Sequence, residues 1–357
     1  MSTATETPAF TPAVEQETRH LYERVRHVIP EVEWPVHASL ISAINHLKAE
    51  REAIILVHNY MRPEIFHGVS DFSGDSLGLA QFGERTPAKT IVMCGVHFMA
   101  ETAKILSPGK TVLLPDAEAG CSLASSITAA DVRRLRQQHP GVPVVTYVNT
   151  SAEVKAESDV CCTSANAVQV VESLGTDEVI FIPDQFLGKY VASRTRVKLI
   201  LWNGVCEVHE RFSGAELRDF REMHPGIHVM AHPECPPDVL AEADYVGSTS
   251  AMIKHVGEAR PERVAMITEC SMASNVAVEY PEVQFIQPCN LCPHMQRITL
   301  PKILAALENM QPQIEVPDEI GVRARQSLER MLAVGRGTGR DPIRSAGHGA
   351  SHGAGRN

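Results

Sequence analysis

The chain alternates between short apolar runs and segments in which apolar residues recur with a helical period. Apolar runs of this kind, flanked by helices, are typical of buried parallel strands in α/β layers. Nine runs are predicted to be strands: residues 53–60, 90–94, 111–114, 143–148, 178–182, 197–202, 227–231, 263–268 and 283–287. The predicted fold class is therefore α/β, with helices packed against parallel sheets.

Three markers recur along the chain about every 85 residues, which indicates a repeated unit. The first is a cysteine after a short apolar run, at Cys121, Cys206 and Cys292. The second is a hydroxyl residue that opens a helical pattern, at Thr128, Ser213 and Thr299. The third is an aspartate followed five residues later by a hydroxyl residue: Asp71 with Ser76, Asp159 with Ser164, and Asp244 with Thr249.

The repeat predicts three homologous αβα domains arranged around a pseudo-threefold axis. Each domain is expected to begin with a helix and a strand, followed by the loop that carries the aspartate and the hydroxyl residue. Two further helix–strand pairs come next, and the cysteine follows the last strand. The expected boundaries are 35–127, 128–212 and 213–298, after an N-terminal tail and helix (1–34) and before C-terminal helices (299–334). Residues 335–357 are rich in Gly, Ser, Arg and His without an apolar period, so a disordered tail is expected there.

Local signals fix several helix ends. Ser213 and Glu216 have the spacing of a capping box at a helix start. The helices that open at Thr128 and Ser213 both run into His-Pro-Gly, at residues 139–141 and 224–226, where they are expected to stop. These two segments are predicted to be equivalent elements.

Composition narrows the classes of function. With 44% hydrophobic and 21% charged residues, the chain of 357 residues has the composition of a soluble globular protein. The formal net charge of −10 and the aromatic share of 5% argue against nucleic acid or an anionic membrane as a partner. Residues 1–20 lack the pattern of a signal peptide, and the apolar runs are too short to cross a bilayer. A cytoplasmic protein is expected.

The nine cysteines are spread through the chain, which favours metal binding or catalysis in a reducing compartment over structural pairing. Five have no counterpart in the other repeats and are expected to be small buried hydrophobic residues: Cys94, Cys161, Cys162, Cys235 and Cys270. Cys289 forms a C-x-x-C with Cys292, which leaves open a dithiol–disulfide pair or an alternative metal ligand.

The three recurring cysteines each follow the last predicted strand of their unit. Ligands gather beyond the carboxyl ends of strands in α/β layers, so a threefold arrangement would bring Cys121, Cys206 and Cys292 together. Three thiolates suit an iron–sulfur cluster or a Cys₃ metal site in which one coordination position stays open. The alternative is that each is a buried hydrophobic residue, but the shared period favours the metal site.

Polar residues end the first strand of each unit: His58 and Tyr60, Tyr147 and Asn149, and His232 and Glu234. Glu234 with His232 is a candidate acid–base pair. Ser76, Ser164 and Thr249 stand where helices are expected to begin, and are therefore either plain N-caps or part of an anion site. His209 either orients the metal site or contacts substrate, or is an exposed histidine at a helix start.

Blocks of residues carry a resemblance to the quinolinate synthase family, from about His58 to Leu300. The blocks include 58–60, 74–77, 95–106, 119–124, 147–152, 162–167, 183–184, 202–209, 232–235 and 247–249. Some members of the family carry C-x-x-C-x-x-C in the last block, whereas this chain has Met295 at the third position.

The resemblance implies a [4Fe-4S] cluster at the centre of the three domains, held by Cys121, Cys206 and Cys292, with an open iron that acts as a Lewis acid. It also implies condensation of iminoaspartate with dihydroxyacetone phosphate to quinolinate, in NAD biosynthesis. The residues expected to bind substrate are His58, Ser76, Tyr147, Asn149, Ser164, His232, Glu234 and Thr249. Tyr60, His232 and Glu234 are expected to be catalytic.

Because iminoaspartate is unstable, a transient contact with L-aspartate oxidase, the enzyme that makes it, is a further hypothesis. Two other functions remain possible from the residues. One is an iron–sulfur hydro-lyase that removes water from a hydroxy acid. The other is a zinc-holding scaffold without catalysis, which would leave the group of His, Tyr and Glu residues unexplained.

Overall fold

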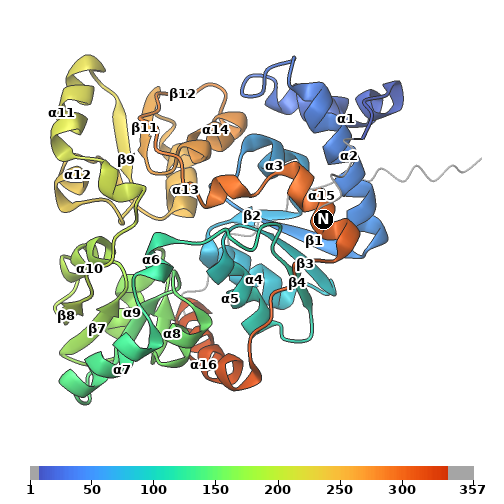
Figure 1. Cartoon of the computed structure of the whole chain (residues 1–357). Helices are drawn as coiled ribbons and strands as arrows, with labels where there is room; N and C mark the ends of the chain where they lie inside the picture. The colour runs from blue at the N-terminus through green and yellow to red at the C-terminus, as the bar shows by residue number, and fades with distance from the viewer. Residues whose placement is uncertain (1–7, 337–357) are drawn as a thin grey trace, which may run out of the picture.

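The computed structural model describes residues 8–336, and within them it contains three four-stranded parallel sheets (Figure 1). The first sheet has the order β2-β1-β3-β4, formed by β1 (Ala53–His58), β2 (Phe72–Gly74), β3 (Thr90–Cys94) and β4 (Thr111–Leu113). Parallel strands with helices in the connections make this an α/β protein, as predicted.

The second and third sheets repeat this order. The second is β6-β5-β7-β8, from β5 (Val144–Tyr147), β6 (Val160–Cys162), β7 (Glu178–Ile182) and β8 (Lys198–Leu201). The third is β10-β9-β11-β12, from β9 (His228–Ala231), β10 (Tyr245–Val246), β11 (Arg263–Ile267) and β12 (Gln284–Phe285). We call the stretches that carry these sheets the first, second and third units.

All nine predicted strands are present, most of them one to three residues shorter than expected. The prediction of three strands in each unit was nevertheless wrong, because each sheet has a fourth strand where a loop was expected: β2, β6 or β10. These strands contain only two or three residues and lie at a sheet edge, paired with β1, β5 or β9. So short a strand gives too little alternation to be recognised from sequence.

Helices connect the strands and flank the sheets. In the first unit they are α2 (Trp34–Glu50), α3 (Pro63–Gly68), α4 (Ser76–Arg85), α5 (His97–Leu106) and the single turn α6 (Ser122–Ser125). The second unit has α7 (Ala129–Gln138), α8 (Ala152–Ala156), α9 (Ala167–Ser173), α10 (Gln185–Ala192) and the 3₁₀ turn η1 (His209–Arg211). The third has α11 (Gly214–Met223), α12 (Pro237–Ala241), α13 (Thr249–Ala259), α14 (Cys270–Glu279) and η2 (Met295–Arg297).

Three further helices lie at the ends of the chain. α1 (Pro12–Val25) precedes the first unit and packs on α2. α15 (Leu300–Asn309) returns to α2 and β3 of the first unit, and α16 (Asp318–Arg336) packs on α8 and β6 of the second unit and on α5 of the first. The C-terminal helices therefore join the first two units. The tail predicted at 335–357 lies almost wholly outside the described residues.

The recurring aspartates hold the central strand of each sheet in the same way. Each carboxylate accepts a hydrogen bond from a strand N–H at 2.7–2.8 Å, and each aspartate N–H donates to the carbonyl of the same strand residue. The pairs are Asp71 with Ile55, Asp159 with Val144, and Asp244 with Val229. A basic residue from the preceding long helix pairs with each carboxylate: Lys48, Arg136 or Arg221. The spacing of these aspartates thus reflects a repeated structural contact.

The predicted helix starts are confirmed, since Thr128, Ser213 and Thr299 are the N-caps of α7, α11 and α15. The full capping box is at Thr128 and Asp131, whereas the hydroxyl of Ser213 donates to the carboxylate of Glu216 and accepts from its N–H. α7 and α11 end at their His-Pro-Gly segments, in which Gly141 and Gly226 have φ of +81° and +78°. This left-handed backbone is one that glycine adopts without a steric penalty.

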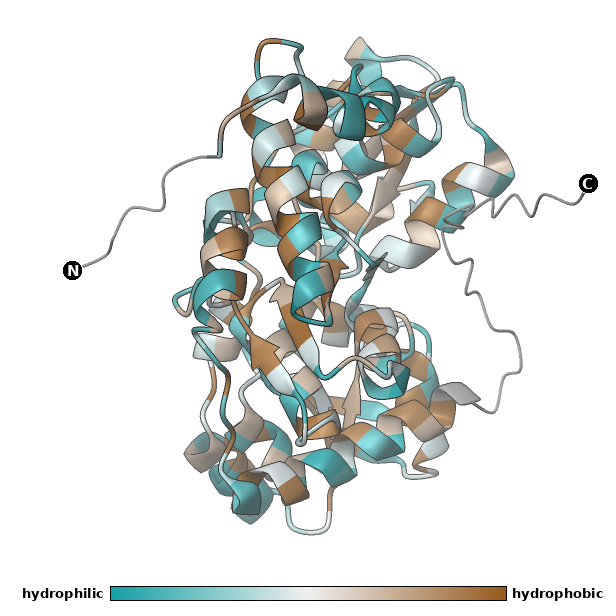
Figure 2. Ribbon diagram, turned by 90° about the vertical axis from the view of Figure 1, so that its right-hand side faces the viewer, coloured by the Kyte–Doolittle hydropathy of each residue, from teal (hydrophilic) through white to brown (hydrophobic). Residues whose placement is uncertain are grey.

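The core follows the central strands. The side chains of β3, β5 and most of β1 and β7 are buried, and Figure 2 shows hydrophobic residues along strands inside the molecule. The predicted domain boundaries coincide with the N-caps named above, but the division into independent domains stays a prediction. Within residues 8–336 no helix combines the length and the apolar composition that a membrane crossing requires.

Candidate active site

An open cavity of about 700 Å³ contains every residue that the sequence singled out for a site. It lies where the carboxyl ends of strands from all three units meet. Its lining includes Cys121, Cys206, Cys292, His58, Tyr60, Ser76, Tyr147, Asn149, Ser164, His232, Glu234 and Thr249. Their convergence is observed, whereas their individual roles stay predictions.

The loops that carry the three recurring cysteines are built alike. Two residues before each cysteine, a carbonyl accepts a hydrogen bond from the N–H that opens a helix of the same unit: Ala119 from His97, Gly204 from Gln185, and Asn290 from Cys270. The carbonyl of each cysteine then accepts from the fourth residue after it, at 3.0 Å in all three loops. A short helical turn follows each cysteine, so its thiol is held at the cavity wall.

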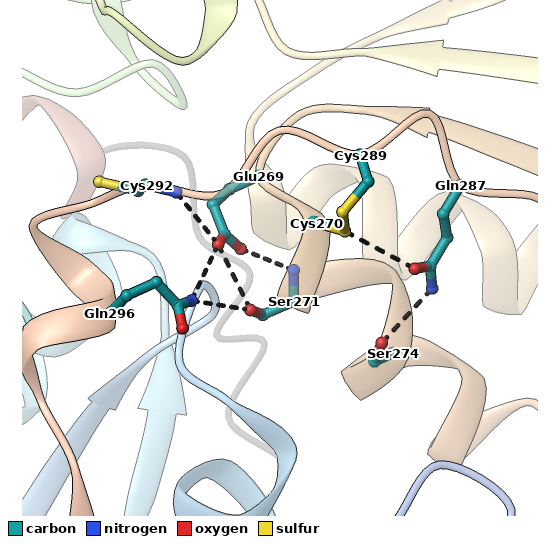
Figure 3. The surroundings of a disulfide bond; sticks show 8 residues. All are labelled: Glu269, Cys270, Ser271, Ser274, Gln287, Cys289, Cys292 and Gln296. Carbon is teal, nitrogen blue, oxygen red and sulfur yellow. Dashed lines mark hydrogen bonds between the residues drawn. A yellow bond between two sulfur atoms is a disulfide. The ribbon is translucent and has the colours of Figure 1, made fainter.

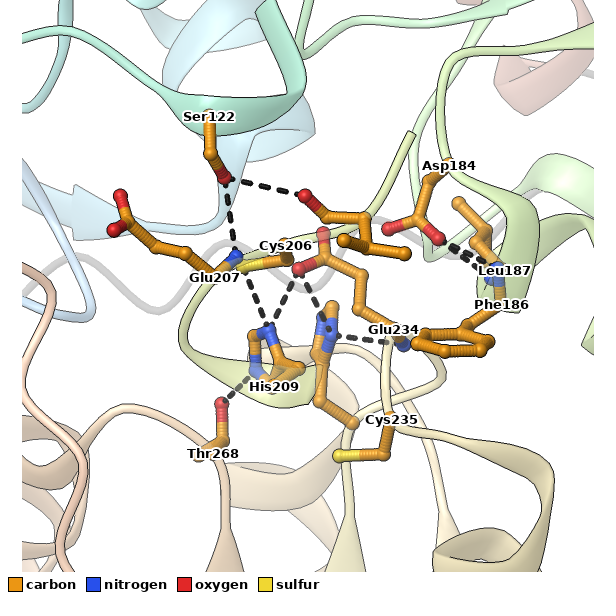
Figure 4. Close-up of polar contacts among 12 residues, drawn as sticks. Ser122, Asp184, Phe186, Leu187, Cys206, Glu207, His209, Glu234, Cys235 and Thr268 are labelled. Carbon is orange, nitrogen blue, oxygen red and sulfur yellow. Dashed lines mark hydrogen bonds and ion pairs between the residues drawn. The ribbon is translucent and has the colours of Figure 1, made fainter. Parts of the chain in front are cut away.

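The three cysteine loops also contact one another. The hydroxyl of Ser122 donates to the carbonyl of Val205 and accepts from the N–H of Glu207 (Figure 4). Glu207 in turn lies 3.0 Å from the imidazole of His294, two residues after Cys292. A side chain at Gly120 would start 3.4 Å from that imidazole, so the first and third loops are also adjacent. These contacts link all three loops at the cavity.

The thiols need a metal, or another positive group, to ionise. Burial raises the pKa of Cys121 to about 12 and that of Cys292 to about 11, and it raises the pKa of Cys206 well above its ordinary value. Metal binding stabilises the thiolate and releases the proton. Cys206, His209 and Glu234 also bring one ligand atom each to within 4.8 Å of one another, which is a possible metal-binding group.

Glu234 is the centre of a buried hydrogen-bond network. One carboxylate oxygen accepts from the hydroxyl of Tyr147 at 2.5 Å. The other lies 2.8 Å from Nδ1 of His209 (Figure 4). Although burial opposes ionisation, His232 and His209 hold the pKa of Glu234 below its usual range. Glu234 is therefore a carboxylate that accepts hydrogen bonds.

The tyrosines and histidines beside Glu234 stay uncharged at neutral pH. Burial raises the pKa of Tyr60 and of Tyr147 well above that of a free tyrosine, and the charge of Glu234 adds to the effect. Burial lowers the pKa of His58 to about 4 and that of His232 to about 3. At neutral pH the cavity thus presents phenolic hydroxyls and neutral imidazoles beside one carboxylate.

His209 is a buried residue of the site, so the alternative of an exposed histidine was wrong. Its Nδ1 lies 3.2 Å from the sulfur of Cys206, and its ring stacks on that of His232 with centroids 4.8 Å apart. Its Nε2 lies 2.9 Å from the hydroxyl of Thr268. His209 therefore connects a cysteine loop of the second unit to two groups of the third.

The recurring hydroxyl residues are not helix caps. The N-caps are the neighbouring Asp75 and Ser248, so Ser76 and Thr249 occupy the first helical positions of α4 and α13. Ser164 precedes α9, whose N-cap is Asn166. The hydroxyls are consequently free of the capping bond and line the cavity. This corrects the N-cap alternative and leaves an anion site as their predicted role.

Two cysteines are paired, which the sequence did not predict. Cys270 at the start of α14 and Cys289 form a disulfide with a Cα–Cα distance of 5.0 Å (Figure 3). The expectation that Cys270 is a plain buried thiol was wrong, and Cys289 does not pair with Cys292. Cys94, Cys161, Cys162 and Cys235 are free and buried, as expected.

Glu269, the N-cap of α14, lies between this disulfide and the loop of Cys292. Its carboxylate accepts hydrogen bonds from the N–H groups of Ser271 (2.7 Å) and Cys292 (3.4 Å). Figure 3 shows the thiol of Cys292 directed away from the disulfide. The disulfide thus fastens the chain that leads to Cys292 without using that thiol.

Comparison with known proteins agrees with this geometry. The family model described as quinolinate synthetase A protein matches residues 42–333. The chain belongs to this family. It is 58% identical to quinolinate synthase of Sinorhizobium fredii over 324 residues, which cover 91% of this chain and 90% of the relative. It is 59% identical to quinolinate synthase 1 of Mesorhizobium japonicum over 322 residues, covering 90% and 99% respectively.

Two polar residues of the cavity lining, Glu207 and His294, were not predicted from sequence. Neither was Thr268, which lies outside the lining but contacts Tyr60 and His209. Glu207 and His294 each lie within two residues of a recurring cysteine, and that proximity was a usable signal. Thr268 ends the predicted strand 263–268, at the carboxyl end where ligands gather. Thr268 lies two residues before Cys270, whose N–H opens α14. The residues two positions before the equivalent N–H groups of the first and second units are Gly95 and Pro183, so the repeat gave no indication of Thr268.

The disulfide predicts how many cysteines react with a thiol reagent before and after reduction. In the unfolded, metal-free chain without reductant, seven of the nine cysteines should react with a thiol reagent, and all nine should react after reduction. Cys270→Ser should raise the unreduced count to eight because Cys289 loses its partner. Cys94→Ser, a control that leaves the disulfide intact, should lower it to six. Nine reactive thiols without reductant would contradict the pairing.

Burial of His58 predicts a loss of stability in acid. The unfolded chain takes up this proton near pH 6.5, whereas the folded chain takes it up only near pH 4. Stability should therefore fall as the pH drops below about 6.5, by about 2 kcal/mol at pH 5 from this group. Urea unfolding at pH 7 and pH 5 should show a smaller pH effect for His58→Gln than for wild type. Equal pH effects would contradict the prediction.

Proposed function

We propose that the protein is a quinolinate synthase that condenses iminoaspartate with dihydroxyacetone phosphate. The observation that carries the proposal is the single cavity in which three alike cysteine loops from three units meet Glu234 and its network. Membership of the quinolinate synthetase A family supports it. The products are quinolinate, phosphate and two waters, so the reaction balances without an oxidant or a reductant.

Cys121, Cys206 and Cys292 would hold a [4Fe-4S] cluster at the centre of a pseudo-threefold arrangement of αβα domains. The donor set fits this group, because three thiols reach one cavity from three loops and none of them belongs to the disulfide. When bound, the cluster would supply an iron with an open position that polarises substrate oxygen or nitrogen as a Lewis acid.

The hydroxyls around the cavity suit the anionic groups of the substrates. Ser76 and Thr249 stand at the first turn of α4 and α13, where backbone N–H groups and the helix dipole favour carboxylate or phosphate. Ser164 and Asn149 add polar atoms from the second unit. Such local donors are required because the chain as a whole carries a net charge of −10.

The hydrogen-bond network of Glu234 would carry out the proton transfers. As a carboxylate between His209 and Tyr147, Glu234 can accept a proton from substrate, and His232 adjoins it as a neutral imidazole. His58 and Tyr147 add polar contacts from the first and second units. Tyr60 keeps its proton at neutral pH and presents a phenol to the cavity. Condensation with loss of water needs both a group that accepts protons and a group that donates them.

Two further expectations belong to this proposal. The protein would act in the cytoplasm, in de novo NAD biosynthesis. A transient contact with L-aspartate oxidase would transfer iminoaspartate before it decomposes. Equal quinolinate flux with the two enzymes mixed or separated by a dialysis membrane would contradict that contact.

The ligand set can be tested by iron and sulfide analysis of protein purified without oxygen. Wild type should contain about four irons and four sulfides per chain and should form quinolinate. Cys121→Ala, Cys206→Ala and Cys292→Ala should each lose iron and activity. Cys94→Ala and Cys289→Ala, which change cysteines outside the predicted set, should retain iron. Zinc in place of iron would contradict the proposal and favour a zinc-holding scaffold. Removal of water from a hydroxy acid without quinolinate formation would instead identify the protein as a hydro-lyase.

A further inference from the structure

Two histidines meet at the amino end of the third sheet, at the opposite end of β9 from the cavity. His228 is the first residue of β9, which leads to His232 in the cavity wall, and His255 belongs to α13 (Figure 1). Their Nε2 atoms lie 3.0 Å apart, whereas their ring centroids are 5.1 Å apart. The two rings therefore face each other through these nitrogens.

Neighbouring side chains hold both rings in place. The ring of Tyr245, in β10, stacks on that of His255 with centroids 4.0 Å apart and an angle of 14° between the planes. On the other side of the pair, Nδ1 of His228 lies 3.8 Å from a carboxylate oxygen of Asp244, which Arg221 holds at 2.7 Å. A carboxylate beside the far nitrogen of a histidine is the arrangement that orients imidazoles at metal sites.

Both Nε2 atoms can act as metal ligands. Neutral imidazole binds Cu²⁺, Ni²⁺ and Zn²⁺ through a ring nitrogen. Without a metal, one nitrogen of the pair must carry a proton that the other accepts, and a bound ion would replace that proton. The side chain of His228 keeps 27% of its surface exposed, so water can reach an ion at this place.

The separation of the two nitrogens suits a single ion. A metal about 2.1 Å from both atoms, which are 3.0 Å apart, would bind them at about a right angle. This is the angle between neighbouring ligands in tetragonal Cu²⁺ and Ni²⁺ sites. A small tilt of each ring turns both lone pairs toward the ion.

We propose that His228 and His255 form a binding site for one divalent transition-metal ion of the class of Cu²⁺, Ni²⁺ and Zn²⁺. Its ligands would be the two imidazoles and water, with Asp244 beside His228. The site is separate from the cavity of the three cysteine loops and does not depend on the proposed function. Because its ligands come from β9 and α13, the ion would fasten a strand to a helix and stabilise the folded third unit.

The test is calorimetric titration of the anaerobic holoenzyme with NiCl₂, together with thermal unfolding. Wild type should bind one Ni²⁺ at this site without releasing iron, and NiCl₂ should raise its melting temperature more than MgCl₂, since Mg²⁺ prefers oxygen ligands. His228→Gln and His255→Gln should each weaken this binding by about 100-fold or more, because a single imidazole loses the advantage of two linked ligands. The double variant should bind no more weakly than either single variant.

Two controls separate this site from other histidines. His46→Gln changes an exposed histidine of α2 and should bind Ni²⁺ like wild type. A variant with both His348→Gln and His352→Gln, which lie outside the described residues, should also retain the site.

Three results would overturn the inference. The first is a wild-type protein that binds no Ni²⁺, which would reduce the pair to a hydrogen bond between two imidazoles. The second is binding that survives in both His228→Gln and His255→Gln, or that is lost in either control. The third is release of iron in proportion to the Ni²⁺ bound, which would place the ion at the cysteines.

Discussion

One backbone hydrogen bond, repeated three times, decides where the reactive groups of this protein lie. A carbonyl two residues before each recurring cysteine accepts from the N–H at the start of a helix in the same unit. This bond fastens the chain as it leaves the last strand and turns the cysteine toward the cavity. The interval of 85 or 86 residues between the cysteines is thus the distance in sequence between equivalent bonds.

The sheets that support these bonds could be predicted from sequence because their determinants are local. Apolar runs identified nine strands, and Thr128, Ser213 and Thr299 identified the helix starts. The marker aspartates were visible as a period, but only the structure shows that Asp71 and its equivalents bind a strand N–H and a basic side chain. The edge strands β2, β6 and β10 could not be predicted, since two or three residues carry no periodic signal.

The rest of the site depends on contacts between distant segments, which no local pattern records. Cys270 and Cys289 pair because the start of α14 lies beside the loop before Cys292. Ser76 and Thr249 are adjacent to Asp75 and Ser248, which are equally good capping residues, so sequence could not decide which of each pair faces the cavity. Thr268 stands where the other units have Gly95 and Pro183, and symmetry therefore gave no indication of it.

The return of α15 and α16 to the first two units has a consequence for biosynthesis. α15 packs on α2 and β3, both more than 200 residues earlier in the chain, and α16 packs on α8 and on α5. A nascent chain that has just completed the third unit still lacks the helices that cover the first and second. The first two units can therefore complete their packing only after the residues of α16 have been synthesised.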